Sequence, residues 1–111
     1  MRKLRIALAL LPILLVGALA YSPARAEGVV FLVRHAEKSL EVEGDSAPLL
    51  AAGVDRAKTL ARMLADAGIE ELVTTDALRS RQTGAPFAER TGLQPQVTTR
   101  DGQVALAARL R

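Results

Sequence analysis

A continuous apolar run at residues 28–33 ends directly on the tetrapeptide Arg34-His35-Ala36-Glu37. The run is rich in β-branched side chains and has no polar alternation, which predicts a strand covered on both faces, as in a parallel sheet. Open parallel sheets bind ligands beyond the carboxyl ends of their strands. His35 is the only histidine in the chain, but lone histidines are commonly surface or core residues. The tetrapeptide therefore marks a candidate site without establishing one.

The first 26 residues have the three parts of a secretory signal peptide. A basic start is followed by an apolar segment at residues 6–20 and by the small-x-small pattern Ala24-Arg25-Ala26. The alternative is a retained membrane anchor, but the apolar segment is shorter than the roughly 20 residues that span a bilayer as a helix. We therefore expect cleavage before Glu27, a periplasmic or secreted location, and a mature domain at residues 27–111.

Removal of this segment changes the meaning of the basic isoelectric point. Four of the 15 Lys and Arg residues, and none of the 12 acidic residues, lie in residues 1–26. Outside the signal peptide the charges nearly balance, and only two aromatic rings remain, Phe31 and Phe87. Nucleic acid is therefore not an expected partner, and no membrane association is expected after cleavage. The chain has no cysteine, so its stability must come from packing.

The rest of the chain alternates between strand and helix patterns. Apolar residues at helical spacing predict a first helix whose buried stripe includes Val54, and glycines at positions 68 and 92 are placed to end helices. Thr75 or Asp76 could cap the second helix. We expect helices at residues 51–67, 77–90 and 104–111 and strands at residues 69–74 and 94–99. This order predicts βαβ units on a parallel sheet.

The second helix carries Arg79 and Arg81 in its first turns. Backbone amides at a helix start favour an anion, and guanidinium groups match phosphate oxygens. If the strands before Arg34 and Arg79 open onto one sheet edge, an imidazole lies there between guanidinium groups. This arrangement is suited to phosphoryl chemistry.

Four segments, at residues 31–38, 48–63, 72–88 and 92–97, resemble in order the conserved segments of the histidine phosphatase superfamily. This family includes phosphoglycerate mutase-like enzymes and small exported phosphohistidine phosphatases. The resemblance is carried by FLVRHAEK and by T-T-D-x-x-R-x-R-Q-T at their observed separation. It implies an α/β fold, a three-layer sandwich around a mostly parallel sheet, that is incomplete at the C-terminus.

The resemblance also implies that His35 is the nucleophile that takes the phosphoryl group as phosphohistidine, while Arg34 and Arg79 hold that group. No cofactor or metal is implied. The expected substrate is a phosphorylated small molecule or a phosphoprotein, and the oligomeric state is left open. The remaining motif residues have structural alternatives: a structural role is expected for Arg81 and Gln82, and either a solvated loop pair or a substrate contact for Glu37 and Lys38.

The sequence departs from the family pattern in two ways. The family's pocket uses a second histidine on a later strand, which these 111 residues do not contain. Leu50 stands where a threonine usually caps the first helix. The expected function is phosphomonoester or phosphohistidine hydrolysis. The alternative is a truncated, non-catalytic remnant that binds phosphate esters.

Overall fold

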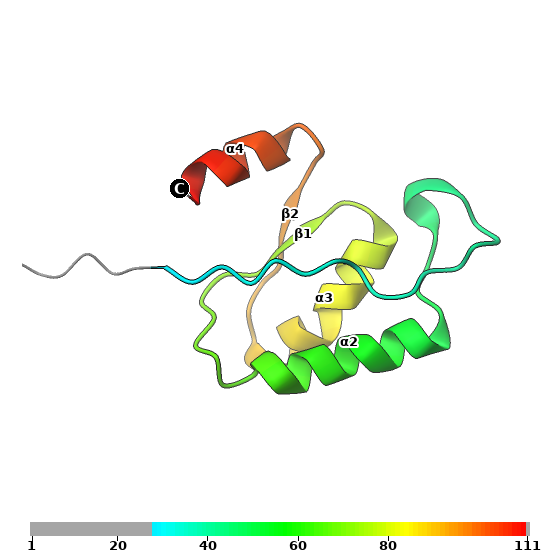
Figure 1. The fold of residues 1–111 in the computed structure, drawn as a ribbon, viewed down its shortest axis with the longest axis horizontal. Coiled ribbons are helices and arrows are strands. Elements are labelled where there is room, and N and C mark those ends of the chain that lie inside the picture. The colour runs from blue at the N-terminus through cyan, green and yellow to red at the C-terminus, as the bar shows by residue number, and fades with distance from the viewer. Residues whose placement is uncertain (1–27, 111) are drawn as a thin grey trace, which may run out of the picture.

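The structure, a computed structural model, describes residues 28–110. The predicted signal peptide at residues 1–26 and the final residue of the predicted helix at 104–111 lie outside the described residues. The elements in chain order are η1 (Gly44–Ser46), α2 (Ala51–Leu64), β1 (Val73–Thr75), α3 (Leu78–Thr91), β2 (Gln96–Thr98) and α4 (Gly102–Arg109) (Figure 1). The predicted α/β class is confirmed. No helix in the described range has the length and hydropathy of a bilayer-spanning segment.

Strands β1 and β2 pair in parallel, with Thr74 opposite Val97. Helix α3 connects the two strands, which gives the predicted βαβ unit. Figure 1 shows α4 on one side of the strand pair and α2 and α3 on the other. The helices therefore lie in layers on both sides of the sheet. Each strand is shorter than the sequence pattern indicates.

Helix α2 packs through small side chains. Gly53, Ala57 and Ala61 are its buried residues, and their four-residue spacing places them on one face. The prediction that Val54 belongs to the buried stripe is wrong, since this side chain is exposed. The buried place one residue earlier is taken by Gly53, where the backbone of Glu37 leaves no room for a side chain. The helix begins after Leu50 without a side-chain cap, as the missing threonine predicts.

Helix α3 buries Thr83 and Phe87 and ends at Gly92, whose φ of 75° is the left-handed conformation that glycine adopts without strain. The predicted capping of this helix by Thr75 or Asp76 is wrong, because the N-cap is Ala77 and makes no side-chain hydrogen bond. The first turn is instead connected to β1 by Ser80, whose hydroxyl accepts a hydrogen bond from the Thr75 amide at 3.0 Å.

Residues 28–33 do not form the predicted buried strand. They precede every element of regular structure, and the apolar side chains from Val29 to Val33 are all exposed, Leu32 almost completely. An apolar run gives a strand only when a neighbouring backbone hydrogen-bonds to it. Among the described residues the sheet contains only β1 and β2. The run is therefore left without a partner strand.

Candidate active site

The loop that carries His35 is fixed by contacts to both long helices. The carbonyl oxygen of Glu37 accepts a hydrogen bond from the Leu50 amide at 2.8 Å, at the start of α2. The Ala36 amide donates to the Thr83 hydroxyl of α3 at 3.0 Å, in a buried position. A Cβ atom at Gly53 would lie 2.3 Å from the Glu37 carbonyl oxygen. The loop thus lies directly on α2 and cannot shift toward it.

One ring nitrogen of His35 makes a hydrogen bond within this loop. Its Nδ1 atom lies 2.8 Å from the carbonyl oxygen of Ala36. A carbonyl can only accept a hydrogen bond, so Nδ1 must carry the proton. In the neutral ring the lone pair is then on Nε2, for which the described residues provide no hydrogen-bond partner. In its neutral form the half-buried imidazole therefore leaves Nε2 unprotonated.

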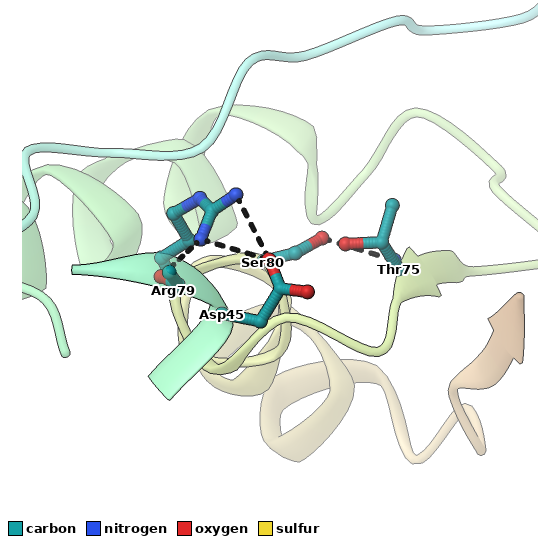
Figure 2. A network of polar contacts seen from close by, with 5 residues as sticks. Asp45, Thr75, Arg79 and Ser80 are labelled. Atoms are coloured by element: carbon teal, nitrogen blue, oxygen red, sulfur yellow. Dashed lines mark hydrogen bonds and ion pairs between the residues drawn. The ribbon is translucent and has the colours of Figure 1, made fainter. Parts of the chain in front are cut away.

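Arg79 lies in the first turn of α3, as the sequence predicts, but its guanidinium group is already in contact with the chain. Nη1 donates to the Gly44 carbonyl oxygen at 3.0 Å, and both terminal nitrogens lie 3.4 Å from Oδ1 of Asp45 (Figure 2). Among the described contacts no hydrogen bond joins Arg79 to His35. The two residues are connected indirectly, because the Thr83 hydroxyl donates to the Arg79 carbonyl oxygen at 2.7 Å.

Arg34 is exposed and lies on the wall of a cavity of about 180 Å³ between its own segment and α2. The remaining wall is largely apolar and includes Val33, Leu60 and Met63. Neither His35 nor Arg79 lines this cavity. This cavity therefore includes one of the three predicted site residues. Arg34 and His35 are neighbours in the chain. The Thr83 hydroxyl group links the backbone of Arg79 to the loop that carries them.

Residues 30–101 match the sequence pattern of the histidine phosphatase superfamily (branch 1). The chain belongs to this superfamily. The matched range contains Arg34, His35 and Arg79, and it ends within the connection between β2 and α4.

Members of the superfamily with sequences and folds similar to this chain include mutase-like and phosphatase-like proteins. A candidate phosphoglycerate mutase, GpmB from Yersinia enterocolitica, is 37% identical over 70 residues, which are 59% of this chain and 33% of GpmB. The candidate phosphohistidine phosphatase SixA from Nakamurella multipartitia is 33% identical with a TM-score of 0.50, covering 64% of this chain and 40% of that one.

A second SixA structure, from Agrobacterium tumefaciens, has a TM-score of 0.53 at 20% identity, covering 68% of this chain and 56% of the other. At that identity the likeness concerns the fold alone. The chain thus spans a third to just over half the length of these relatives.

Two of the remaining motif residues make contacts within the chain. Gln82 accepts a hydrogen bond from the Leu49 amide through Oε1 at 2.8 Å, which is the structural role expected for it. Glu37 forms an ion pair with Arg56 of α2. A hydrogen bond from its own backbone amide lowers the pKa of the Glu37 carboxyl group, desolvation opposes this effect, and the hydrogen bond and charge of Arg56 lower the pKa further.

Sequence reasoning did not identify Thr83, Gly53 and Asp45 as residues that organise the site. Two of the three carry a signal in the sequence. Thr83 lies four residues after Arg79 and therefore on the same face of α3, and Gly53 is a glycine inside a predicted helix, which is unusual without a packing reason. Asp45 gives no such signal. In residues 28–110, no three His, Cys, Asp or Glu side chains are grouped so that they could hold a metal ion.

Proposed function

We propose that the protein is a phosphatase that hydrolyses phosphomonoesters or phosphohistidine through a covalent phosphohistidine on His35. The observation that carries this proposal is the hydrogen bond between Nδ1 and the Ala36 carbonyl oxygen. When the ring is neutral, this contact selects the tautomer in which Nε2 bears the lone pair. Nucleophilic catalysis requires that form, since a protonated imidazole has no electron pair to donate. Family membership and the RHAE sequence of the loop support the same assignment.

In the first step, Nε2 forms a bond to phosphorus as the bond between phosphorus and the leaving oxygen or nitrogen breaks. The leaving group departs with that electron pair and takes up a proton. In the second step, water forms a bond to phosphorus, the Nε2–phosphorus bond breaks, and inorganic phosphate is released with His35 restored. Two steps of this kind replace one difficult displacement. Catalysis then depends mainly on positioning and on neutralisation of charge.

Arg34 and Arg79 are the two groups proposed to neutralise the phosphoryl oxygens. A guanidinium group stays charged at any working pH and offers paired donors to phosphate oxygens. Arg34 adjoins His35 in the chain, and Arg79 is held near the same loop through Thr83. Removal of one such donor from a transferring group costs about 2.7–4 kcal/mol, or 10²–10³ in rate, in comparable sites.

The proposed covalent mechanism is tested with an aryl phosphate substrate and intact-mass measurement. We expect His35→Ala to abolish turnover and Arg79→Ala to lower it by about 10²–10³. Rapid quenching of the wild type in alkaline denaturant should trap an enzyme carrying one phosphoryl group that is stable to alkali and labile to acid. His35→Asn is the matched control, since it preserves polarity without the nucleophile. Turnover that survives His35→Ala contradicts the covalent mechanism.

The alternative is a protein that binds phosphate esters without turnover. It is favoured by one observation, that the 111 residues hold a single histidine where the family's pocket uses two. The two functions differ in a single-turnover experiment. A phosphatase releases inorganic phosphate from an ester in a single turnover. A binding protein shows saturable phosphate binding and no release from an ester.

The substrate class is proposed from the relatives. The SixA neighbour from Nakamurella multipartitia is a candidate phosphohistidine phosphatase, which favours a phosphohistidine-containing protein, whereas the GpmB match favours a small phosphate ester. A comparison of kcat/KM for a phosphohistidine protein and for an aryl phosphate distinguishes them. We expect kcat/KM to be higher for the phosphohistidine protein than for the aryl phosphate. The additional contacts of a protein substrate contribute to transition-state binding.

A further inference from the structure

Arg79, the arginine proposed to bind the phosphoryl group, is covered by an acidic turn. Figure 2 shows the Asp45 carboxylate directed at the guanidinium group, and both terminal nitrogens lie 3.4 Å from its Oδ1 atom. The Arg79 side chain is 23% exposed, and that of Asp45 is 65% exposed. The arginine is thus largely enclosed by the chain, while its carboxylate partner remains open to water.

The turn that carries Asp45 is anchored at its base and through the Gly44 carbonyl oxygen, which accepts a hydrogen bond from Arg79, whereas the Asp45 side chain is exposed. Element η1 is followed by Ala47, which is fully buried. The next residues are held by two hydrogen bonds, from the Ser39 amide to the Pro48 carbonyl oxygen at 2.8 Å and from the Leu49 amide to the Gln82 side-chain oxygen Oε1 at 2.8 Å. Gly44 begins the turn with a φ of 75°, and residues 40–46 before the anchor are exposed. Asp45 can therefore leave Arg79 without disturbing the core.

A carboxylate and a phosphoryl group place the same demand on a guanidinium group, because both accept its paired N–H donors. Arg79 cannot give its full set of donors to both. The carboxylate carries one negative charge, whereas a phosphomonoester carries nearly two at neutral pH. An internal carboxylate therefore weakens the binding of every anion, and a doubly charged phosphoryl group overcomes this competition more readily than a singly charged anion does.

We propose that Asp45 is a specificity-determining residue that occupies Arg79 in the absence of substrate and competes with the incoming phosphoryl group. This inference rests on the proposed function, since it takes Arg79 as a phosphate-binding residue. The contact to the Gly44 carbonyl oxygen keeps Arg79 oriented while the exchange takes place at its other donors.

The test is the dissociation constant of inorganic phosphate, measured by isothermal titration calorimetry on the full-length protein. Asp45→Asn keeps the size and an acceptor oxygen but removes the charge. We expect it to tighten phosphate binding about twofold to fivefold, the range that corresponds to an exposed ion pair. The matched control is Glu43→Gln, which removes the same charge from the same exposed segment at a residue that makes no described ion pair.

Three outcomes are distinguishable. Tighter binding in Asp45→Asn with an unchanged value in Glu43→Gln supports the competition. Equal effects of the two variants, or no effect of either, overturn it while phosphate binding through Arg79 still stands. Phosphate binding that is unchanged in Arg79→Ala, or absent from the wild type, overturns the proposed function and the inference with it.

Discussion

The hydroxyl of Thr83 accepts a buried hydrogen bond from the backbone amide of Ala36 at 3.0 Å, across 47 positions of the sequence. The same hydroxyl donates to the Arg79 carbonyl oxygen at 2.7 Å. One side-chain oxygen therefore joins the loop of the proposed nucleophile to the helix that carries the proposed phosphate-binding arginine. Thr83 makes both contacts because the hydroxyl group acts as donor and acceptor at once.

Substitution of Thr83 should loosen this connection. Thr83→Val keeps the shape but leaves the Ala36 amide buried without a partner, which costs about 1–3 kcal/mol of unfolding free energy. Thr83→Ser should restore most of the loss, because it returns the hydroxyl. We expect kcat to fall in Thr83→Val with little change in KM. The measurements are chemical denaturation and steady-state turnover.

Thr91→Val is the matched control for this prediction. Thr91 makes the same bond to the carbonyl oxygen four residues earlier, that of Phe87, but it has no contact with the His35 loop. Its substitution should leave kcat unchanged. Equal losses of kcat in Thr83→Val and Thr91→Val would contradict a positioning role for Thr83.

Gly53→Ala should destabilise the protein although it replaces a glycine inside a helix. Such a change usually stabilises a helix by roughly 0.5–1 kcal/mol. Here the new methyl group would lie 2.3 Å from a backbone oxygen of Glu37, and backbone cannot move aside as a side chain can. We expect a net loss of about 1–3 kcal/mol in unfolding free energy, measured by urea denaturation.

The comparison variant is Gly84→Ala in α3. There the nearest atom is a methyl group of Thr74 at 3.0 Å, a side-chain contact that can give way. The loss in Gly84→Ala should therefore be smaller than in Gly53→Ala. If the two variants are equally stable, the close approach of the Glu37 loop to α2 is not a constraint on the fold.

The sequence predicts the parts of this fold that depend on neighbouring residues. Helical periodicity and the terminal glycine Gly92 locate α3, and alternation of helix and strand patterns predicts the parallel pairing of β1 with β2. The unpaired state of residues 28–33 could not be predicted from the sequence. An apolar run indicates an extended backbone but does not show whether a partner strand lies beside it. Hydropathy correctly places Ala57 and Ala61 in the buried stripe of α2, but it also includes Val54 and overlooks Gly53, which packs closely because it has no side chain.

The candidate site divides in the same way. Motif spacing is enough to select His35, Arg34 and Arg79 as candidates, and their roles remain predictions. The tautomer of His35 and the covering of Arg79 by Asp45 require coordinates, since one depends on the direction of a carbonyl group and the other joins residues 34 positions apart.

Export is expected to remove the first 26 residues. Cleavage after Ala26 would give a periplasmic or secreted protein that begins at Glu27, and intact-mass measurement of the native protein with N-terminal sequencing checks this. Replacement of the basic residues Arg2, Lys3 and Arg5 by glutamine should reduce export, because the positive start of a signal peptide is part of its recognition. A native protein that begins at Met1 would contradict cleavage and favour a retained anchor.

The Glu37 carboxylate, through the hydrogen bond from its own backbone amide and its ion pair with Arg56, should make a small contribution to stability that depends on pH. The pKa of Glu37 is lowered in the folded protein, so the folded state holds its proton less tightly than the unfolded state. The contribution is therefore present above the unfolded pKa of the carboxyl group and is lost as the pH falls through the lowered folded value. Glu37→Gln should be less stable than the wild type at pH 7 and equally stable under strongly acidic conditions, measured by urea denaturation at both pH values. If Glu37→Gln is as much less stable than the wild type in acid as at pH 7, the substitution acts through packing and not through the charge of Glu37.

The exposed apolar run at residues 28–33 should drive self-association of the 111-residue chain. Leu32 is 97% exposed and lies within five consecutive exposed apolar side chains, and an extended segment without a partner strand can pair with another molecule. We expect Leu32→Asp to shift the weight-average mass in sedimentation equilibrium toward the monomer. Leu40→Asp is the matched control, because Leu40 is 86% exposed but its immediate neighbours in the loop, Ser39 and Glu41, are polar. Equal effects of the two substitutions would mean that added negative charge, and not the apolar run, controls association.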